Sequence, residues 1–250
     1  ATPVFADIDP ATHNLDPAAV ERVITSRTTA LMPVHVWGRP CDVKGLQDVA
    51  NRHRLHLLYD AAHALGSSCA GTPVGQFGEA SILSFHATKM VNSFEGGAIL
   101  TDQDALAEEC RLLRNFGFAG KDHVVMVGTN AKMHEVSAAM GLTSLEAFAA
   151  FAGVNQAHFQ QYRLEFADLP GLDLVDLEPA EVPSMHYVVA TVDPRAGGLT
   201  RDDLLAVLEA ENVLARRYFY PGCHRMAPYA ERGPWDLLVT EDLLERVIQF

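Results

Sequence analysis

The chain has 250 residues, 48% of them hydrophobic, and its mean hydropathy of +0.04 is typical of a folded globular protein rather than a disordered one. Its formal charge at pH 7 is −13, from 19 Lys and Arg against 32 Asp and Glu. Such an acidic surface repels phosphate backbones, which argues against a nucleic-acid-binding protein. No apolar run approaches the roughly 18 residues that a membrane-spanning helix needs, so we expect no contact with a membrane.

The first sixty residues alternate between strand and helix patterns. Asp16 followed by Pro17 is a typical N-cap and first helical residue, which predicts a helix to about Ser26. Asp42 stands at the same place before the next apolar helical pattern. The predicted elements are strands over residues 3–9, 30–36 and 55–59 and helices over residues 17–26 and 43–53.

This order of elements places a carboxylate where ligands bind in α/β proteins. Strands that alternate with helices at this spacing predict right-handed crossovers and a mostly parallel central sheet with helices on both faces. In such sheets ligands collect beyond the carboxyl ends of the strands. Asp60 directly follows the third predicted strand, so we expect it in a binding site.

Beyond Asp60, two more strands flank the loop of Lys89, and a helix that Asp102 caps leads into a glycine-rich irregular stretch. A long apolar helical pattern then runs to Phe166, with an expected interruption near Gly153. We expect a large α/β domain over residues 1–150 and a smaller C-terminal α+β domain over 151–250. The predicted elements are strands over residues 80–85, 98–101, 172–175 and 186–192, helices over 103–115, 135–166 and 200–211, and the irregular stretch over 117–130.

The cysteines and histidines indicate neither a disulfide framework nor a metal site. No two cysteines form a CxxC pair, and in a chain of this size they are typical of reduced thiols in a cytoplasmic protein. His53 and His56 have the spacing of metal ligands, but no third ligand accompanies them, so we expect no metal. The cysteines are Cys41, Cys69, Cys110 and Cys223.

Residues 57–100 hold most of the chemistry that the sequence offers. They read LLYDAAHALGSS, then SILSFHATKM, then NSFEGGAIL, and contain Asp60, His63, Ser84 and Lys89. Lys89 lies among apolar residues, and burial would lower its pKa toward a free amine. Each residue also has an ordinary structural role: a surface lysine, a carboxylate that caps a helix, a structural histidine, and a serine bonded to its own backbone.

This stretch resembles the DegT/DnrJ/EryC1/StrS family of sugar aminotransferases, a branch of the fold-type I pyridoxal-phosphate enzymes. The family reads D-A-A-(Q/H)-A-x-G, then S-F-x-x-x-K, then a Gly-Gly pair, with Asp and Lys 29 positions apart as in this chain. The later stretch GTNAKMHEVSAA resembles the family's G-x-N-x-(R/K)-M-x-E-x-x-A-A. The resemblance implies the fold-type I transferase fold.

The resemblance also implies a role for each site residue. Lys89 would form a Schiff base with pyridoxal 5'-phosphate and later move a proton as general base and acid. Asp60 would hold the pyridine nitrogen protonated, His63 would lie against the ring, and Ser84 would donate to the phosphate. Asn130 would reach the cofactor phosphate of a partner subunit, which implies a homodimer with a shared active site.

The implied reaction is a ping-pong transfer of an amino group from an amino acid, L-glutamate in most members, to a nucleotide-linked keto-deoxy sugar. We expect a dTDP-4-keto- or 3-keto-6-deoxyhexose as the acceptor. Two alternatives stay open: a sugar dehydratase of the same family, in which histidine replaces the lysine, and a non-catalytic regulatory or sensing member. The residues expected to border the sugar-nucleotide site are Trp37, His186, Tyr220 and His224.

By comparison with the family, we expect the first strand and helix of the large domain, and the last strand of the small one, to lie outside residues 1–250. The family's backbone cradle for the cofactor phosphate belongs to that first segment. Cofactor affinity would be poor without it.

Overall fold

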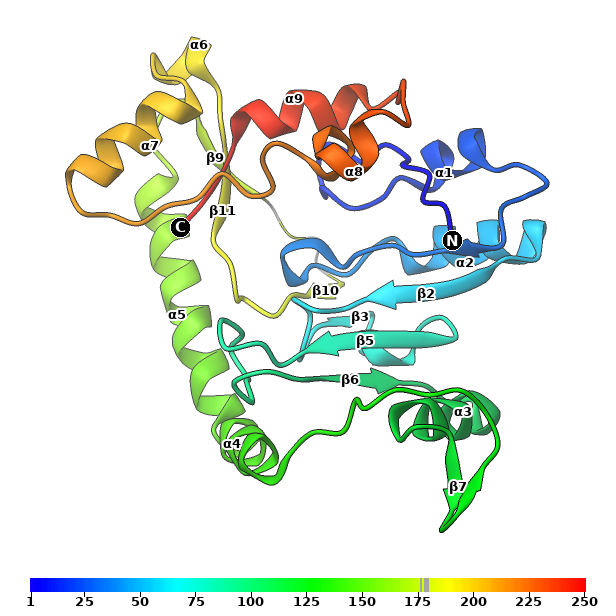
Figure 1. Ribbon diagram of the computed structural model, residues 1–250. Coiled ribbons are helices and arrows are strands. Elements are labelled where there is room, and N and C mark those ends of the chain that lie inside the picture. The colour runs from blue at the N-terminus through cyan, green and yellow to red at the C-terminus, as the bar shows by residue number, and fades with distance from the viewer. Residues whose placement is uncertain (176, 178–179) are drawn as a thin grey trace.

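The computed structural model describes residues 1–175, 177 and 180–250 (Figure 1). Its α-helices are α1 (Pro17–Val23), α2 (Val43–His53), α3 (Asp104–Arg114), α4 (Glu135–Glu146), α5 (Phe148–Phe166), α6 (Pro194–Gly197), α7 (Arg201–Ala210), α8 (Ala227–Ala230) and α9 (Leu238–Arg246). Its strands are β1 (Ala30–Leu31), β2 (His56–Asp60), β3 (Ser68–Cys69), β4 (Thr72–Pro73), β5 (Ala80–Ser84), β6 (Gly97–Leu100), β7 (Phe118–Gly120), β8 (His123–Val124), β9 (Leu172–Leu174), β10 (Glu181–Val182), β11 (Val189–Val192) and β12 (Val247–Gln249).

The largest sheet has the strand order β1-β2-β5-β6. β1, β2 and β5 are parallel, with Asp60 opposite Ile82, and β6 runs antiparallel to β5. This confirms the prediction of an α/β fold with a mostly parallel central sheet. Because β2 and β5 run in the same direction, their carboxyl ends share one edge of the sheet.

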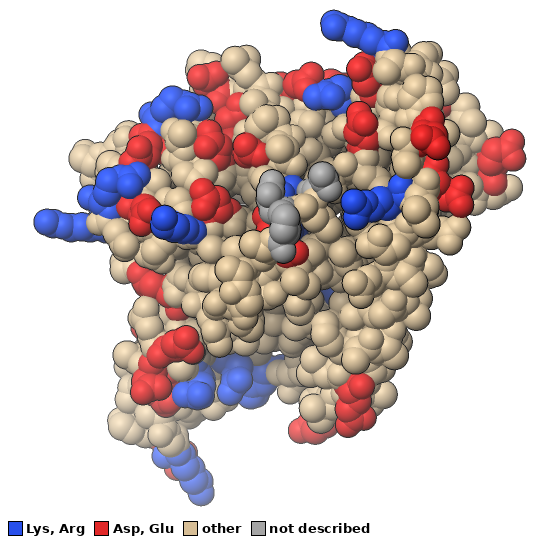
Figure 2. Space-filling view, turned by 180° about the vertical axis from the view of Figure 1, so that it is seen from behind, with Lys and Arg blue, Asp and Glu red and all other residues tan. Residues whose placement is uncertain are grey.

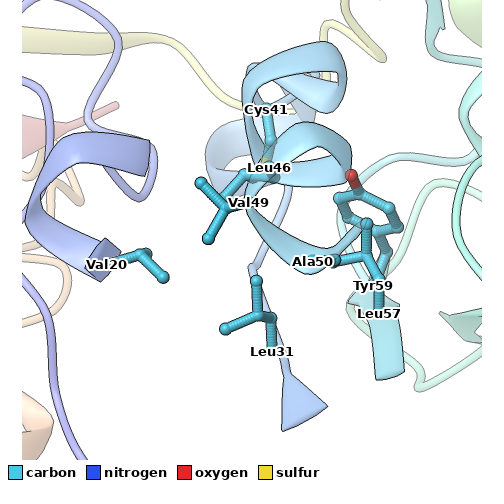
Figure 3. Close-up of a cluster of buried hydrophobic side chains, with 8 residues drawn as sticks. All are labelled: Val20, Leu31, Cys41, Leu46, Val49, Ala50, Leu57 and Tyr59. Carbon is cyan, nitrogen blue, oxygen red and sulfur yellow. The ribbon is translucent and has the colours of Figure 1, made fainter. Parts of the chain in front are cut away.

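Helix α2 packs on this sheet and forms the centre of its core (Figure 3). It begins where the Asp42 carboxylate accepts a hydrogen bond from the Gly45 N–H, and it ends at Arg54 in the left-handed conformation. Its apolar residues recur at helical spacing and face α1, β1 and β2. The buried residues of this cluster are Val20, Leu31, Cys41, Leu46, Val49, Ala50, Leu57 and Tyr59.

The chain beyond α5 forms a separate antiparallel sheet in the order β12-β11-β9. A buried cluster that includes Ala190, Val192 and Ile248 packs this sheet against α7. β10 pairs with β3, so the chain touches the first part of the molecule again before it enters β11. Helix α5 runs through residues 149–155 without a break, and the division into two domains at this point stays a prediction.

Several local predictions were wrong. The strand predicted over residues 30–36 is limited to Ala30–Leu31, followed by a single bridge between Val34 and Asp60. The helical pattern breaks at Ala147, with a 57° bend between α4 and α5, and not at Gly153. Helix α3 has Gln103 as its N-cap, with no side-chain cap from Asp102. Residues 117–130 contain the hairpin β7–β8. Residues 3–9 form no strand and make a single bridge between Ile8 and Leu15, because the carboxylate of Asp7 instead caps a distant helix.

Charged side chains of both signs are intermixed on the face that Figure 2 shows, and a broad uncharged area lies below them. Basic side chains on this face are interspersed with acidic ones. Among the described residues, no single helix is both long and apolar enough to cross a membrane, although the bent pair α4 and α5 would meet the criteria together.

Candidate active site

The carboxyl ends of three parallel strands, β1, β2 and β5, lie at one edge of the central sheet, in which Figure 1 labels β2 and β5. Trp37 lies in the short 3-10 turn after β1, Asp60 ends β2, and Ser84 ends β5. His63 and Lys89 follow in the loops after β2 and β5. The site therefore forms where the strand directions predict it, beyond the carboxyl ends.

Lys89 is half-buried, and its Nζ donates a hydrogen bond to the hydroxyl of Tyr187 at 3.5 Å. Burial lowers the pKa of the amine below its ordinary value, and the negative charge of Asp60 partly opposes this. The structure thus places Lys89 and Asp60 in one electrostatic environment. A lysine with a lowered pKa holds more of the neutral amine that can act as a nucleophile or base.

The carboxylate of Asp60 is held in place by backbone groups and keeps capacity for a ligand. One of its oxygens accepts a hydrogen bond from the Ala62 N–H at 2.9 Å. The backbone of Asp60 is fixed in turn by bonds with Pro33 and His35, which lie beyond β1. Within the part of the chain that the structure describes, no side chain bonds this carboxylate, so it is able to pair with a bound cation.

His63 is a neutral ring between two aromatic neighbours. Burial and the positive charge of Lys89 lower its pKa to about 4. Its ring meets the edge of Tyr187 at 4.9 Å and stacks parallel to Phe219 at 5.9 Å between centroids. Its Nδ1 is buried and has no hydrogen-bond partner among the described residues, which leaves a polar atom for a ligand or water to satisfy.

His186 reaches the Lys89 loop from the chain before β11. The backbone of Thr88, the residue that precedes Lys89, lies close enough to the His186 ring to raise its pKa against the effect of burial. Burial, helped by the positive charge of Lys89, lowers the pKa of His186. The structure therefore brings His186 close to the Lys89 amine, whereas the sequence predicted for His186 only a contact with the sugar nucleotide.

Trp37 is buried and stacks on Phe219 at 5.1 Å between ring centroids. Its Nε1 donates a hydrogen bond to Nδ1 of His13 at 3.2 Å. The next residue, Gly38, has φ +79°, and a Cβ there would lie 2.6 Å from the His63 carbonyl oxygen. Glycine is required at this position because the two loops approach so closely.

The comparison with known families agrees with this geometry over the whole chain. The model of the DegT/DnrJ/EryC1/StrS aminotransferase family matches residues 1–250. The chain belongs to this family. The match confirms the family that the motifs around Asp60 and Lys89 indicated.

Several members of the family are close in sequence and structure. The dTDP-4-amino-4,6-dideoxy-D-glucose transaminase of Shigella dysenteriae is 40% identical over 88% of this chain and 59% of that protein. The dTDP-3-amino-3,4,6-trideoxy-alpha-D-glucose transaminase of Streptomyces venezuelae is 33% identical over 94% of this chain and 60% of that protein. The crystal structure of DesI in the presence of its TDP-sugar product is 48% identical, with a TM-score of 0.94 over 100% of this chain and 64% of that one. The chain thus spans about three fifths of the length of the curated relatives named here.

Two residues that the family motifs single out have local partners in this structure. The hydroxyl of Ser84 accepts a hydrogen bond from the His86 N–H at 3.3 Å, which leaves its proton free to donate to a ligand. Asn130 is exposed, and its Oδ1 accepts a hydrogen bond from Lys132 Nζ at 2.6 Å. Its backbone forms a bridge with Asn115, the residue after α3, so the two residues close the loop that contains the β7–β8 hairpin.

Tyr220 and His224 make contacts away from Lys89. Tyr220 is 40% exposed and lies under the guanidinium of Arg217, 4.4 Å from the ring centroid. His224 is buried, and its Nε2 is 2.7 Å from a carboxylate oxygen of Glu241 on α9. Contact between either residue and a sugar nucleotide stays a prediction.

Sequence reasoning missed Tyr187 and Phe219. Both line the site beside His63, and Tyr187 contacts the reactive amine itself. They lie more than 90 positions from Lys89 in the chain. Phe219 lies in the stretch YFYPGCH, which resembles a family segment of the form Y-x-P-x-H, but that resemblance singles out Tyr220 and His224 and not Phe219.

Proposed function

We propose that this protein is a pyridoxal-phosphate-dependent aminotransferase that moves an amino group from L-glutamate to a keto-deoxy sugar carried on a nucleotide. The half-buried amine of Lys89, in the field of Asp60 at the carboxyl edge of the sheet, is the observation that carries this proposal. Membership of the family supports it. Lys89 also argues against the dehydratase alternative, in which histidine stands at this position.

The residues present fit pyridoxal phosphate. An amine of lowered pKa suits attachment to an aldehyde, and a carboxylate without a side-chain partner among the described residues suits a pyridinium nitrogen. A neutral, partly buried His63 with an unsatisfied nitrogen suits the face of an aromatic ring. When bound and protonated, the cofactor would supply an electron sink for the carbon that gains or loses a proton.

The chain's own residues would then divide the work. Lys89 would take and return the proton at the reacting carbon. Its lowered pKa leaves more of the amine in the neutral form that accepts a proton. Asp60 would keep the pyridine nitrogen protonated, and His63 would hold the ring plane. Ser84 would donate its hydroxyl proton to the phosphate. Asn130, which is exposed, would act on the phosphate of a second subunit in a homodimer.

Among the expected acceptors we favour a dTDP-4-keto-6-deoxyhexose over the 3-keto isomer. The support is that the 4-amino-sugar transaminase is 40% identical to this chain, whereas the 3-amino-sugar transaminase is 33% identical. Trp37 and His186 lie on the sheet edge where such a sugar would meet Lys89.

A visible absorption spectrum tests the proposal. The purified protein, loaded with pyridoxal phosphate, should show the visible absorption band of a lysine-bound cofactor. Adding L-glutamate should remove that band. Lys89→Ala should show neither effect, whereas Lys44→Ala, which changes an exposed lysine on α2, should behave like the unaltered protein. A protein without the band, or a band that L-glutamate leaves unchanged, would favour the regulatory alternative.

A further inference from the structure

The hydroxyl of Tyr187 faces the reactive amine. Lys89 Nζ and the Tyr187 hydroxyl are 3.5 Å apart, although the two residues are 98 positions apart in the chain. Tyr187 enters from the segment between β10 and β11, opposite the loop that holds Lys89. None of the family motifs in this sequence contains it.

Packing fixes the ring of Tyr187 on several sides. His63, His186 and Trp37 lie around it, with ring centroids 4.9, 4.4 and 6.0 Å away. Tyr187 also lines a small cavity together with Met185 and Val189. The hydroxyl therefore occupies a set position, whereas Lys89 reaches it on a flexible four-carbon stem.

The protonation states of the two groups are complementary. Burial raises the pKa of Tyr187 to about 12, so its phenol keeps its proton at neutral pH. Burial lowers the pKa of Lys89, so a larger fraction of the amine is neutral at a given pH. A phenol accepts a hydrogen bond from an ammonium group and donates one to a neutral amine, so it is able to hold both forms.

We propose that Tyr187 is a positioning residue of this site, whose hydroxyl holds the Lys89 amine where it would meet the cofactor and move protons. This rests on the proposed function, since it assigns a partner to the same amine. Tyr187 does not act as a base in this account, because it stays protonated. Its contribution is to keep the amine aimed into the site whenever the amine is free.

The rate at which pyridoxal phosphate attaches to the cofactor-free protein tests this role without any turnover. We expect Tyr187→Phe to slow attachment about fivefold, which is the effect of losing one hydrogen bond of ordinary strength. Tyr218→Phe is the matched control: it also deletes a phenol hydroxyl beside this ring, but that hydroxyl accepts from Arg216 at 2.7 Å. It should leave the rate unchanged. Equal rates for Tyr187→Phe and the unaltered protein would overturn the inference.

Thermal unfolding of each variant shows whether it is folded. Should Tyr187→Phe fail to fold, 3-fluorotyrosine at position 187 keeps the ring and hydroxyl while lowering the pKa of the phenol. A more acidic phenol donates a stronger hydrogen bond to the neutral amine and so lowers the pKa of Lys89, although Tyr187 itself stays protonated. The pH profile of attachment should therefore shift to lower pH, and an unshifted profile would contradict the inference. If the unaltered protein itself attaches no cofactor, the proposed function fails. If the unaltered protein attaches the cofactor and the Tyr187 variants attach it in the same way, the proposed function stands and this inference alone fails.

Discussion

Asp60 raises the pKa of the Lys89 amine while burial lowers it, although Asp60 ends β2 and Lys89 lies in the loop after β5. Asp60→Asn removes the negative charge and leaves the burial in place. We therefore expect the pKa of Lys89 to fall further in this variant, because its charged form loses its stabilising partner. Competitive acetylation of the cofactor-free protein across a pH range, read by mass spectrometry of the Lys89 peptide, measures this pKa.

Asp48→Asn provides the control for this experiment, since it removes an exposed carboxylate from α2. It should leave the pKa of Lys89 unchanged. An unchanged or higher pKa of Lys89 in Asp60→Asn would show that the two side chains do not share a site.

Asp7 connects the start of the chain to the last helix. It is only 8% exposed, and its carboxylate accepts hydrogen bonds from the N–H groups of Val239 and Thr240 and from the Thr240 hydroxyl. These bonds outweigh burial and lower the pKa of Asp7. We expect Asp7→Ala to reduce the free energy of unfolding by about 2 kcal/mol, since it leaves the first N–H groups of α9 without an acceptor.

Urea unfolding at pH 7 measures this loss, with Asp168→Ala, an exposed aspartate, as the control. The stabilisation by Asp7 should be present above its unfolded pKa of 3.8 and should disappear as the pH falls through its lower folded value. A loss of stability no larger than that of the control would contradict the capping role.

The buried ring of His35 makes stability depend on pH. Burial lowers the pKa of His35 from 6.5 to about 4, so the unfolded chain binds a proton here more readily than the folded one. The contribution of the neutral His35 ring to the free energy of unfolding is fully present above pH 6.5 and falls as the pH drops toward 4. His35→Gln, which keeps an acceptor for the Cys41 N–H, should lose about 2 kcal/mol less than the unaltered protein between pH 7.5 and 5.

Urea midpoints of both proteins at these two pH values provide the measurement. His53→Gln, at an exposed position on α2, should follow the unaltered protein. If His35→Gln and the unaltered protein lose the same stability on acidification, the imidazole is not buried in its neutral form.

Leu46 lies at the centre of the core cluster in Figure 3 and is 0% exposed. Leu46→Ala should lower the free energy of unfolding by about 3 kcal/mol, through lost burial and the cavity that remains. Leu164→Ala, at a position 76% exposed on α5, should cost less than about 0.5 kcal/mol. Chemical denaturation distinguishes the two variants, and similar losses would contradict the packing of α2 on the sheet.

Local signals in the sequence account for the elements that were predicted well. The prediction placed α2 at its observed bounds because its two signals, Asp42 and the apolar spacing, lie within the helix or next to it. Asp60 could be located because strand direction places it at the edge of the sheet where ligands bind, whereas Lys89 was singled out by the family motif around it.

The remaining features depend on partners far away in the chain. The alternating pattern of residues 3–9 is compatible with a strand and also with the observed structure, in which the Asp7 carboxylate caps a helix at Val239, 232 positions later. Gly153 lies inside α5 because a helix tolerates one glycine at a cost of about 1 kcal/mol, whereas Ala147, where the helix bends, is not a breaker by residue type. Tyr187 and Phe219 enter the site only through packing that sequence spacing does not encode.

The most direct test of the central claim is to find which amine the cofactor binds. The chain has four lysines, Lys44, Lys89, Lys121 and Lys132, so the assignment is unambiguous. Pyridoxal phosphate is added, borohydride fixes it to the amine, and digestion with mass spectrometry locates the modified peptide. We predict modification of Lys89 at one equivalent per chain. Modification spread over the other three lysines, with Lys89 untouched, would contradict the proposed active site.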